Sequence, residues 1–222
     1  MLGILTLDTA FPRIRGDVGC PDTFSFPVRL AVVRGATVDG VVHERDDALL
    51  AKFVDAARQL ARDGCAGIVT TCGFLVRWQD ALADALDVPV LTSALLALPV
   101  IERALARDRK VGVVTYSADS LSLDLDAATP LEGVDPSGYF SRTIRHGAHE
   151  LDTSRMASDV VDAARRLVAR QRNVGAIVLE CANMPPYRDA VVAATGLPVF
   201  DAAQVFSWFY TGVASAPARD LW

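Results

Sequence analysis

The sequence predicts an α/β protein made of two similar halves, each with a mainly parallel sheet between layers of helices. Two observations support this prediction. Short apolar runs rich in valine and isoleucine alternate with longer segments of helical periodicity, which is typical of parallel α/β folds. In addition, residues 67–94 align with residues 176–203 without a gap, so that Cys72 falls on Cys181, 109 positions further along. We therefore expect two pseudo-symmetric three-layer lobes with an active site in the cleft between them.

The predicted elements follow the chain in an alternating order. Strands are expected at the apolar runs 2–7, 28–33, 66–71, 88–91, 111–115, 138–144, 176–180 and 198–200. Apolar residues at helical spacing predict helices over 46–62, 75–86, 154–170 and 185–195. Asp152 is a candidate N-cap for the third of these helices, and residues 11–27 form a long loop of the kind that often has a function.

The alignment of the halves also indicates the domain organisation. Identical residues recur at the same offset in many positions: Ile68, Val69, Asp80, Ala81, Ala85, Pro89, Val90 and Ala94. Residues 3–6 likewise fall on residues 112–115. We assign residues 1–92 and 201–222 to an N-terminal lobe, and residues 93–200 to a C-terminal lobe.

Length and composition are typical of a packed globular protein. The chain has 222 residues, 51% of them hydrophobic, which is enough to bury a sizeable core. Its net charge of −5 argues against nucleic acid or an anionic membrane as the main partner. The most apolar run, residues 88–101, is too short to span a bilayer. The first residues resemble a strand and not a targeting peptide, so we expect a cytoplasmic protein.

Each of the two matched cysteines follows a predicted strand and precedes a predicted helix. Ligands of open parallel sheets bind at the carboxyl ends of the strands, so both thiols are expected at the functional edge. A helix N-terminus favours a thiolate, and we therefore expect lowered thiol pKa values for Cys72 and Cys181. Cys20 and Cys65 have no such context and are interpreted as packing residues. No cysteine or histidine spacing indicates a metal site or a disulfide framework.

The chain resembles the aspartate/glutamate racemase superfamily, which also includes hydantoin racemases, maleate isomerases and arylmalonate decarboxylases. The resemblance rests on GILTLDT at 3–9, TTCGF at 70–74, ECANMP at 180–185 and GLPVFD at 196–201. It implies an enzyme that needs no cofactor and forms a homodimer or a higher homo-oligomer. It also implies that Cys72 and Cys181 are the catalytic pair: one thiolate removes a proton from Cα, and the other thiol returns a proton to the opposite face.

Candidate substrate-binding residues lie at the same strand ends. Backbone N–H groups could stabilise the negative charge that develops on the substrate; they belong to Gly73, Phe74, Ala182 and Asn183. Candidates for contacts with the substrate's polar groups are Asp8, Thr9, Thr71, Tyr116 and Ser117, of which Asp8, Tyr116 and Ser117 could equally be capping residues. Glutamate and aspartate racemases typically have Asn-Thr after the first cysteine, so Gly73-Phe74 argues against glutamate as substrate. Ala182 and Met184 resemble the hydantoin racemases instead.

The predicted function is a cofactor-independent racemase or epimerase of an amino acid or amino-acid derivative, with a small-molecule carboxylate or amino-acid-like substrate. Three alternatives stay open: a cis–trans isomerase of an unsaturated dicarboxylate, similar to maleate isomerase; a non-catalytic bilobed binding protein; and a redox protein that cycles a disulfide between Cys72 and Cys181.

Overall fold

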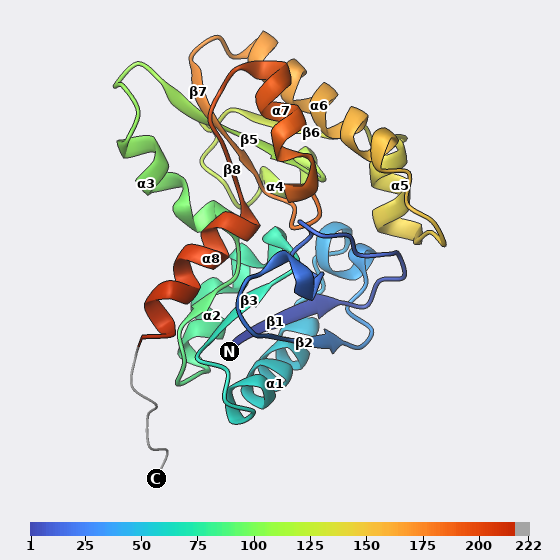
Figure 1. Cartoon of the computed structure of the whole chain (residues 1–222), viewed down its shortest axis with the longest axis vertical. Helices are drawn as coiled ribbons and strands as arrows, with labels where there is room; N and C mark the ends of the chain where they lie inside the picture. Colours follow the sequence, from blue (N-terminus) through green and yellow to red (C-terminus); the bar gives the residue numbers. More distant parts are fainter. Residues whose placement is uncertain (216–222) are drawn as a thin grey trace.

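Within residues 1–215, the part of the chain that the structure describes, two four-stranded parallel sheets form the framework (Figure 1). The structure is a computed structural model. The first sheet has the order β2-β1-β3-β4 and the second β6-β5-β7-β8. The strands are β1 (Leu2–Leu7), β2 (Val28–Val33), β3 (Gly67–Thr70), β4 (Val90–Leu91), β5 (Lys110–Thr115), β6 (Leu131–Gly133), β7 (Val174–Leu179) and β8 (Val199–Asp201). Because the same order recurs in both halves, the predicted pseudo-symmetric α/β fold is confirmed.

Helices cover both faces of the sheets. The α-helices are α1 (Leu49–Arg62), α2 (Gln79–Asp84), α3 (Leu98–Arg103), α4 (Ala118–Leu121), α5 (Tyr139–His146), α6 (Thr153–Arg170), α7 (Arg188–Thr195) and α8 (Ala202–Val213). Shorter turns are the 3-10 segments η1 (Pro21–Thr23), η3 (Gly73–Trp78), η4 (Ala94–Ala97) and η5 (Pro185–Tyr187), and the π-helical η2 (Asp39–His43). No helix in residues 1–215 is long and apolar enough to cross a bilayer.

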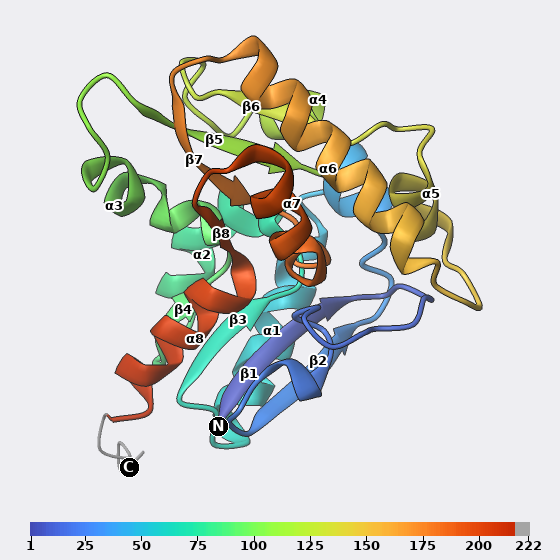
Figure 2. The same cartoon turned by 45° about the horizontal axis from the view of Figure 1, so that its top comes forward.

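The longest helix of each half packs closely against the central strand of its sheet. Helix α1 buries Leu49, Phe53, Ala57 and Leu60 at helical spacing. A Cβ at Gly3 of β1 would lie 3.1 Å from Leu60 Cδ1, so glycine allows the close approach of α1. Helix α6 packs in the same way on β5 and β6 of the second sheet (Figure 2). A Cβ at Gly112 of β5 would lie 2.7 Å from a Leu167 methyl group.

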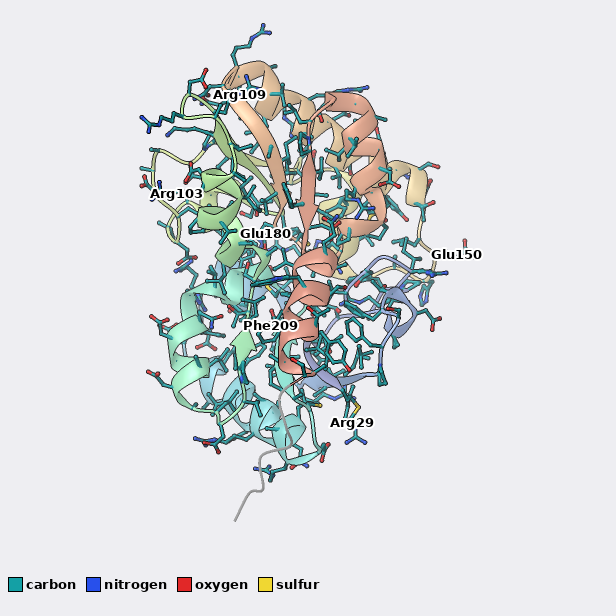
Figure 3. All side chains as sticks on the ribbon, turned by 60° about the vertical axis from the view of Figure 1, so that its left-hand side comes forward. Arg29, Arg103, Arg109, Glu150, Glu180 and Phe209 are labelled. Carbon is teal, nitrogen blue, oxygen red and sulfur yellow. The ribbon has the colours of Figure 1, made fainter. Side chains whose placement is uncertain are left out.

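The inner faces of the two sheets share one apolar cluster. It contains Leu2, Ile4, Val69, Val111, Val178 and Phe206. Helix α8 follows the second sheet in the chain but packs on the first. The two are in close contact: a Cβ at Gly67 of β3 would lie 3.0 Å from the ring of Phe209 in α8 (Figure 3). Assigning residues 201–215 to the N-terminal lobe stays a prediction, and residues 216–222 of that assignment lie outside the described residues.

The predicted strand at 138–144 is wrong, because this segment forms α5. Phe140, Thr143 and Ile144 are buried on one face at helical spacing, and the Asp159 carboxylate accepts a 2.7 Å hydrogen bond from the Phe140 N–H near the helix start. The β-propensity of its aromatic and β-branched residues is overridden by this packing. Strand β5 pairs with β7 on one side and with β6 on the other, and β6 lies earlier in the chain than the predicted segment.

Asp152 caps α6 as predicted, which allows a test of local stability. Its carboxylate accepts hydrogen bonds from the N–H groups of Ser154 at 3.1 Å and Arg155 at 3.0 Å. We expect Asp152→Ala to lower the free energy of unfolding by about 1 kcal/mol, because two N–H groups at the helix start lose their acceptor. Urea denaturation measures this change, and Asp152→Asn is the matched control that keeps an acceptor. Equal stability of the alanine variant and the native protein would show that the Asp152 cap does not stabilise α6.

Candidate active site

A small pocket lies where the carboxyl ends of the central strands of both sheets meet. Its cavity volume is about 30 Å³. Its lining comes from the ends of β1, β3, β5 and β7, from the η2 segment and from α5: Leu7, Val38, Val42, Thr71, Cys72, Gly73, Phe74, Tyr116, Ile144, Glu180, Cys181 and Asn183. The predicted location at the strand ends therefore agrees with the position of the pocket.

The structure brings the two matched cysteines together in this pocket. Cys72 precedes the η3 turn in extended conformation, and Cys181 follows β7 at the equivalent place. Each is 7% exposed and lines the pocket. All four cysteines of residues 1–215 are free thiols, and Cys20 and Cys65 do not line the pocket.

The predicted lowering of the thiol pKa values is wrong for the pocket in this conformation. Burial, and then the nearby Glu180 carboxyl, raise the pKa of Cys72 to about 12. The N–H groups of Phe74 and Leu75 at the start of η3 lower it, but by less. The same two causes raise the pKa of Cys181 well above its usual value. A short helix start favours the thiolate too weakly to offset the loss of solvent.

These raised values predict how Cys72 reacts with alkylating agents. Only the thiolate reacts, and a thiol with a pKa near 12 ionises further with each pH unit below that value. We expect the iodoacetamide labelling rate of Cys72 to rise about tenfold per pH unit up to at least pH 9.5. Mass spectrometry of the labelled peptide measures this rate. A plateau at about pH 8.5, the ordinary thiol pKa, would show that the pKa of Cys72 is not raised.

Glu180 is the site residue that the sequence analysis missed. It is 1% exposed and lines the pocket. Its Oε2 accepts hydrogen bonds from the Thr115 hydroxyl at 2.8 Å and from the Tyr116 N–H at 3.4 Å. Its Oε1 is buried without a hydrogen-bond partner among the described residues. Burial raises the pKa of this carboxyl to about 7, although the Thr115 hydroxyl and the nearby backbone N–H groups lower it. The available signal was a single acidic residue at the end of an apolar strand.

Cys181 is connected through Asn183 to the long loop at residues 11–27, which the sequence predicted to have a function. Its thiol donates a hydrogen bond to Asn183 Oδ1 at 3.5 Å, and Asn183 Nδ2 donates to Asp17 Oδ2 at 2.7 Å. Asp17 in turn forms a 3.1 Å ion pair with Arg13. The chain of contacts fixes Asn183 as an acceptor for the thiol, which favours the protonated form of Cys181.

The other predicted substrate-binding residues divide into two groups. Those that line the pocket are Thr71, Gly73, Phe74, Tyr116 and Asn183. The remaining four do not line it and make structural contacts. Asp8 accepts from the Gly35 N–H at 3.0 Å, and Thr9 accepts from Arg13 at 2.9 Å. Ser117 caps α4, and the Ala182 carbonyl accepts from the Val18 N–H at 3.0 Å.

Apolar side chains that the sequence analysis did not select close the rest of the pocket. Val42 lies in the η2 segment, Val38 immediately precedes it, and Ile144 comes from α5. An Arg145–Asp39 ion pair of 2.7 Å joins these two elements. Arg45 and Asp124 connect the same η2 region to the second half through two 2.8 Å hydrogen bonds. No group of three or more potential metal-binding side chains is present in residues 1–215.

The fold and the pocket define a class of two-lobed α/β protein with one thiol from each half in a shared site. The chain belongs to the Asp/Glu/Hydantoin racemase family, whose sequence profile matches residues 35–209. The predicted membership is thus confirmed.

Named relatives and solved structures refine this assignment. Dimethylsulfoniopropionate lyase 7 of Emiliania huxleyi (strain CCMP1516) is 33% identical over 97% of this chain and 68% of its own length. A dimethylsulfoniopropionate lyase of Durusdinium sp. clade D is 29% identical over 99% of this chain and 77% of its own length. Allantoin racemase from Klebsiella pneumoniae (TM-score 0.66, 15% identity, 99% of this chain and 91% of that chain) shares the fold. Unliganded arylmalonate decarboxylase (TM-score 0.61, 18% identity, 98% and 93%) does so too.

Proposed function

We propose that this protein is a lyase that releases dimethyl sulfide from dimethylsulfoniopropionate and leaves acrylate. The observation that carries the proposal is the similarity to dimethylsulfoniopropionate lyases over nearly the whole chain, 33% identity across 97% of it. The predicted activity was a racemase, and the names of these relatives favour a lyase instead. Both activities begin with the same step, the removal of a proton from the carbon next to a carboxylate.

The elimination needs one base and a stabilised negative charge. A thiolate takes the proton from the carbon next to the carboxylate, and that electron pair forms the double bond of acrylate. The bond between carbon and the sulfonium sulfur breaks, and its electrons leave with neutral dimethyl sulfide. No oxidant or reductant is required. Backbone N–H groups in the turns after the two cysteines can stabilise the charge on the substrate carboxylate in the transition state.

We assign the base role to Cys72. Cys181 donates its thiol hydrogen to Asn183, which keeps it protonated. Both thiols also receive backbone N–H groups that favour the thiolate: those of Phe74 and Leu75 at Cys72, and that of Asn183 alone at Cys181. Burial raises the pKa of Cys72 to about 12, but a bound sulfonium cation lowers the pKa of a neighbouring thiol. The substrate therefore helps to generate the base that attacks it.

The chemistry of the pocket lining fits a sulfonium carboxylate. The methyl groups of a sulfonium donate no N–H hydrogen bonds, and the lining is largely apolar, with the aromatic rings of Phe74 and Tyr116. Aromatic faces attract onium cations. Among the described lining residues there is no lysine, arginine or histidine. A second carboxylate, as in glutamate, aspartate or maleate, would have no cationic partner here.

A racemase of an uncharged amino-acid derivative is the second candidate. One observation favours it: the two thiols come from equivalent positions of the two halves and line one pocket. Inversion at a carbon requires a proton donor and an acceptor on opposite faces, which such a pair supplies.

The two candidates differ in their products. The purified protein is incubated with dimethylsulfoniopropionate, and dimethyl sulfide is measured by gas chromatography. Single enantiomers of allantoin, hydantoins and amino acids are incubated in heavy water, and deuterium at the reacting carbon is measured by mass spectrometry. The proposal expects dimethyl sulfide release and no deuterium in the panel. Absence of dimethyl sulfide would overturn the lyase assignment, and deuterium in one panel compound would favour the racemase.

A further inference from the structure

Glu180 is the only acidic residue among the described residues that line the pocket, and the elimination steps above do not use it. We propose that the Glu180 carboxylate is the counter-ion of the substrate's cationic group, an inference that rests on the proposed function. It then selects carboxylates with an onium centre over carboxylates of the same shape that lack the positive charge. The residue is thus a determinant of substrate specificity.

The internal repeat shows that the fold does not need a carboxylate at this position. At the offset of 109 residues, Glu180 corresponds to Thr71, and Tyr116 corresponds to Leu7. The Thr71 hydroxyl accepts a hydrogen bond from the Leu7 N–H at 3.4 Å. Glu180 Oε2 accepts the equivalent bond from the Tyr116 N–H, also at 3.4 Å. A threonine satisfies this N–H in one half, so the structural task in the other half does not require the longer, charged side chain.

The additional length of Glu180 places Oε1 against the turn that follows Cys72. A Cβ at Gly73 would collide with this oxygen, so the absence of a side chain at Gly73 is what makes room for it. Oε1 is nevertheless buried without a hydrogen bond of good geometry among the described residues, although the Gly73 N–H lies close enough to lower the pKa of the carboxyl. Buried polar atoms are almost always paired. An unpaired, buried oxygen at the edge of a pocket therefore points to a partner that enters with the ligand.

The electrostatic surroundings identify that partner as a cation. The other titratable groups that line the pocket are the thiols of Cys72 and Cys181 and the phenol of Tyr116. The Arg77 guanidinium, outside the lining, also acts on Cys72 and lowers its pKa. The two thiols and the phenol are neutral at pH 7, because burial raises the pKa of Tyr116 to about 12, as it raises those of the thiols. Burial likewise raises the pKa of Glu180 to about 7. A cation beside the carboxyl would restore its ionised form and release a proton. The rings of Phe74 and Tyr116 can face the same cation.

A pair of unreactive ligands isolates the charge from the shape. Dimethylsulfonioacetate has the onium group and the carboxylate but lacks the carbon chain that elimination requires. 3-Methylbutanoate is its carbon isostere, which keeps the carboxylate but lacks the positive charge. Calorimetry on the full chain measures the affinity of both. We expect the native protein to bind the sulfonium ligand at least about tenfold more tightly than the isostere. Glu180→Gln should remove this preference while leaving the affinity for 3-methylbutanoate within about twofold.

Glu180→Thr is the second variant, because it installs the residue that the first half already uses and keeps an acceptor for the Tyr116 N–H. It should lose the preference as the glutamine variant does. Calorimetry at pH 6 in buffers of different ionisation enthalpy gives a second readout. The native protein should release a proton on binding the sulfonium ligand, and neither variant should.

The outcomes separate a counter-ion from other roles. Equal weakening of both ligands by Glu180→Gln would overturn the proposal, since it would show contact with the carboxylate or a structural role. A preference that persists in both folded variants would overturn it as well. If the native protein released no dimethyl sulfide but showed a Glu180-dependent preference for the sulfonium ligand, the lyase assignment would fail and the counter-ion role would stand.

Discussion

Cys72→Ser lowers the rate of dimethyl sulfide release by about 10³-fold or more, if Cys72 is the general base. A serine hydroxyl is far less acidic than a thiol, so almost no alkoxide forms even beside a bound cation. The side chain keeps nearly the same shape, and the 7% exposed site needs no repacking. Gas-chromatographic assay of both proteins at saturating substrate measures the difference.

Cys65→Ser is the matched control, because Cys65 is also a buried free thiol but does not line the pocket. We expect this variant to keep nearly all of the activity. Comparable losses in the two variants would show that removal of any buried thiol disturbs the protein. Unchanged release in Cys72→Ser would exclude Cys72 as the base.

The second large effect concerns Gly73. A methyl group at this position would collide with Glu180 Oε1 and lie 2.8 Å from the Glu180 carbonyl oxygen. We expect Gly73→Ala to displace the turn that holds Cys72. Because the added methyl group overpacks this part of the structure, the free energy of unfolding should fall by about 1–3 kcal/mol. Because the base is misplaced, dimethyl sulfide release should fall by about 10²-fold.

Gly212→Ala is the control for this substitution. A Cβ at Gly212, inside α8, would have no neighbour within 4 Å. The free energy of unfolding should therefore rise by about 0.5–1 kcal/mol, the usual difference between alanine and glycine in a helix. Activity should not change. Native activity in Gly73→Ala would show that the turn after Cys72 tolerates a side chain, and the role of Gly73 would then be wrong.

Much of the fold could be predicted because its buried strands are continuous apolar runs. Seven of the eight strands lie within or beside predicted segments. The exception shows why local pattern is insufficient: residues 138–144 have strand-forming side chains, but burial against α6 and the Asp159 carboxylate make them helical. Tertiary packing of this kind leaves no trace in short windows of sequence.

The candidate site was predictable to the extent that the internal repeat marks it. The repeat identified Cys72 and Cys181, and both line the pocket. It did not identify Glu180, because the equivalent residue is Thr71 and the two are not identical. It also gave the wrong direction for the thiol pKa values, since the dominant cause is burial between the halves, which neither half contains by itself.

The central claim is that the reaction begins by removal of a proton from the carbon next to the carboxylate. It is tested most directly with dimethylsulfoniopropionate deuterated at that carbon, compared with substrate deuterated at the carbon that bears sulfur. The account predicts that the first label slows dimethyl sulfide release severalfold and that the second has little effect. Slowing by the second label alone, with none from the first, would contradict it.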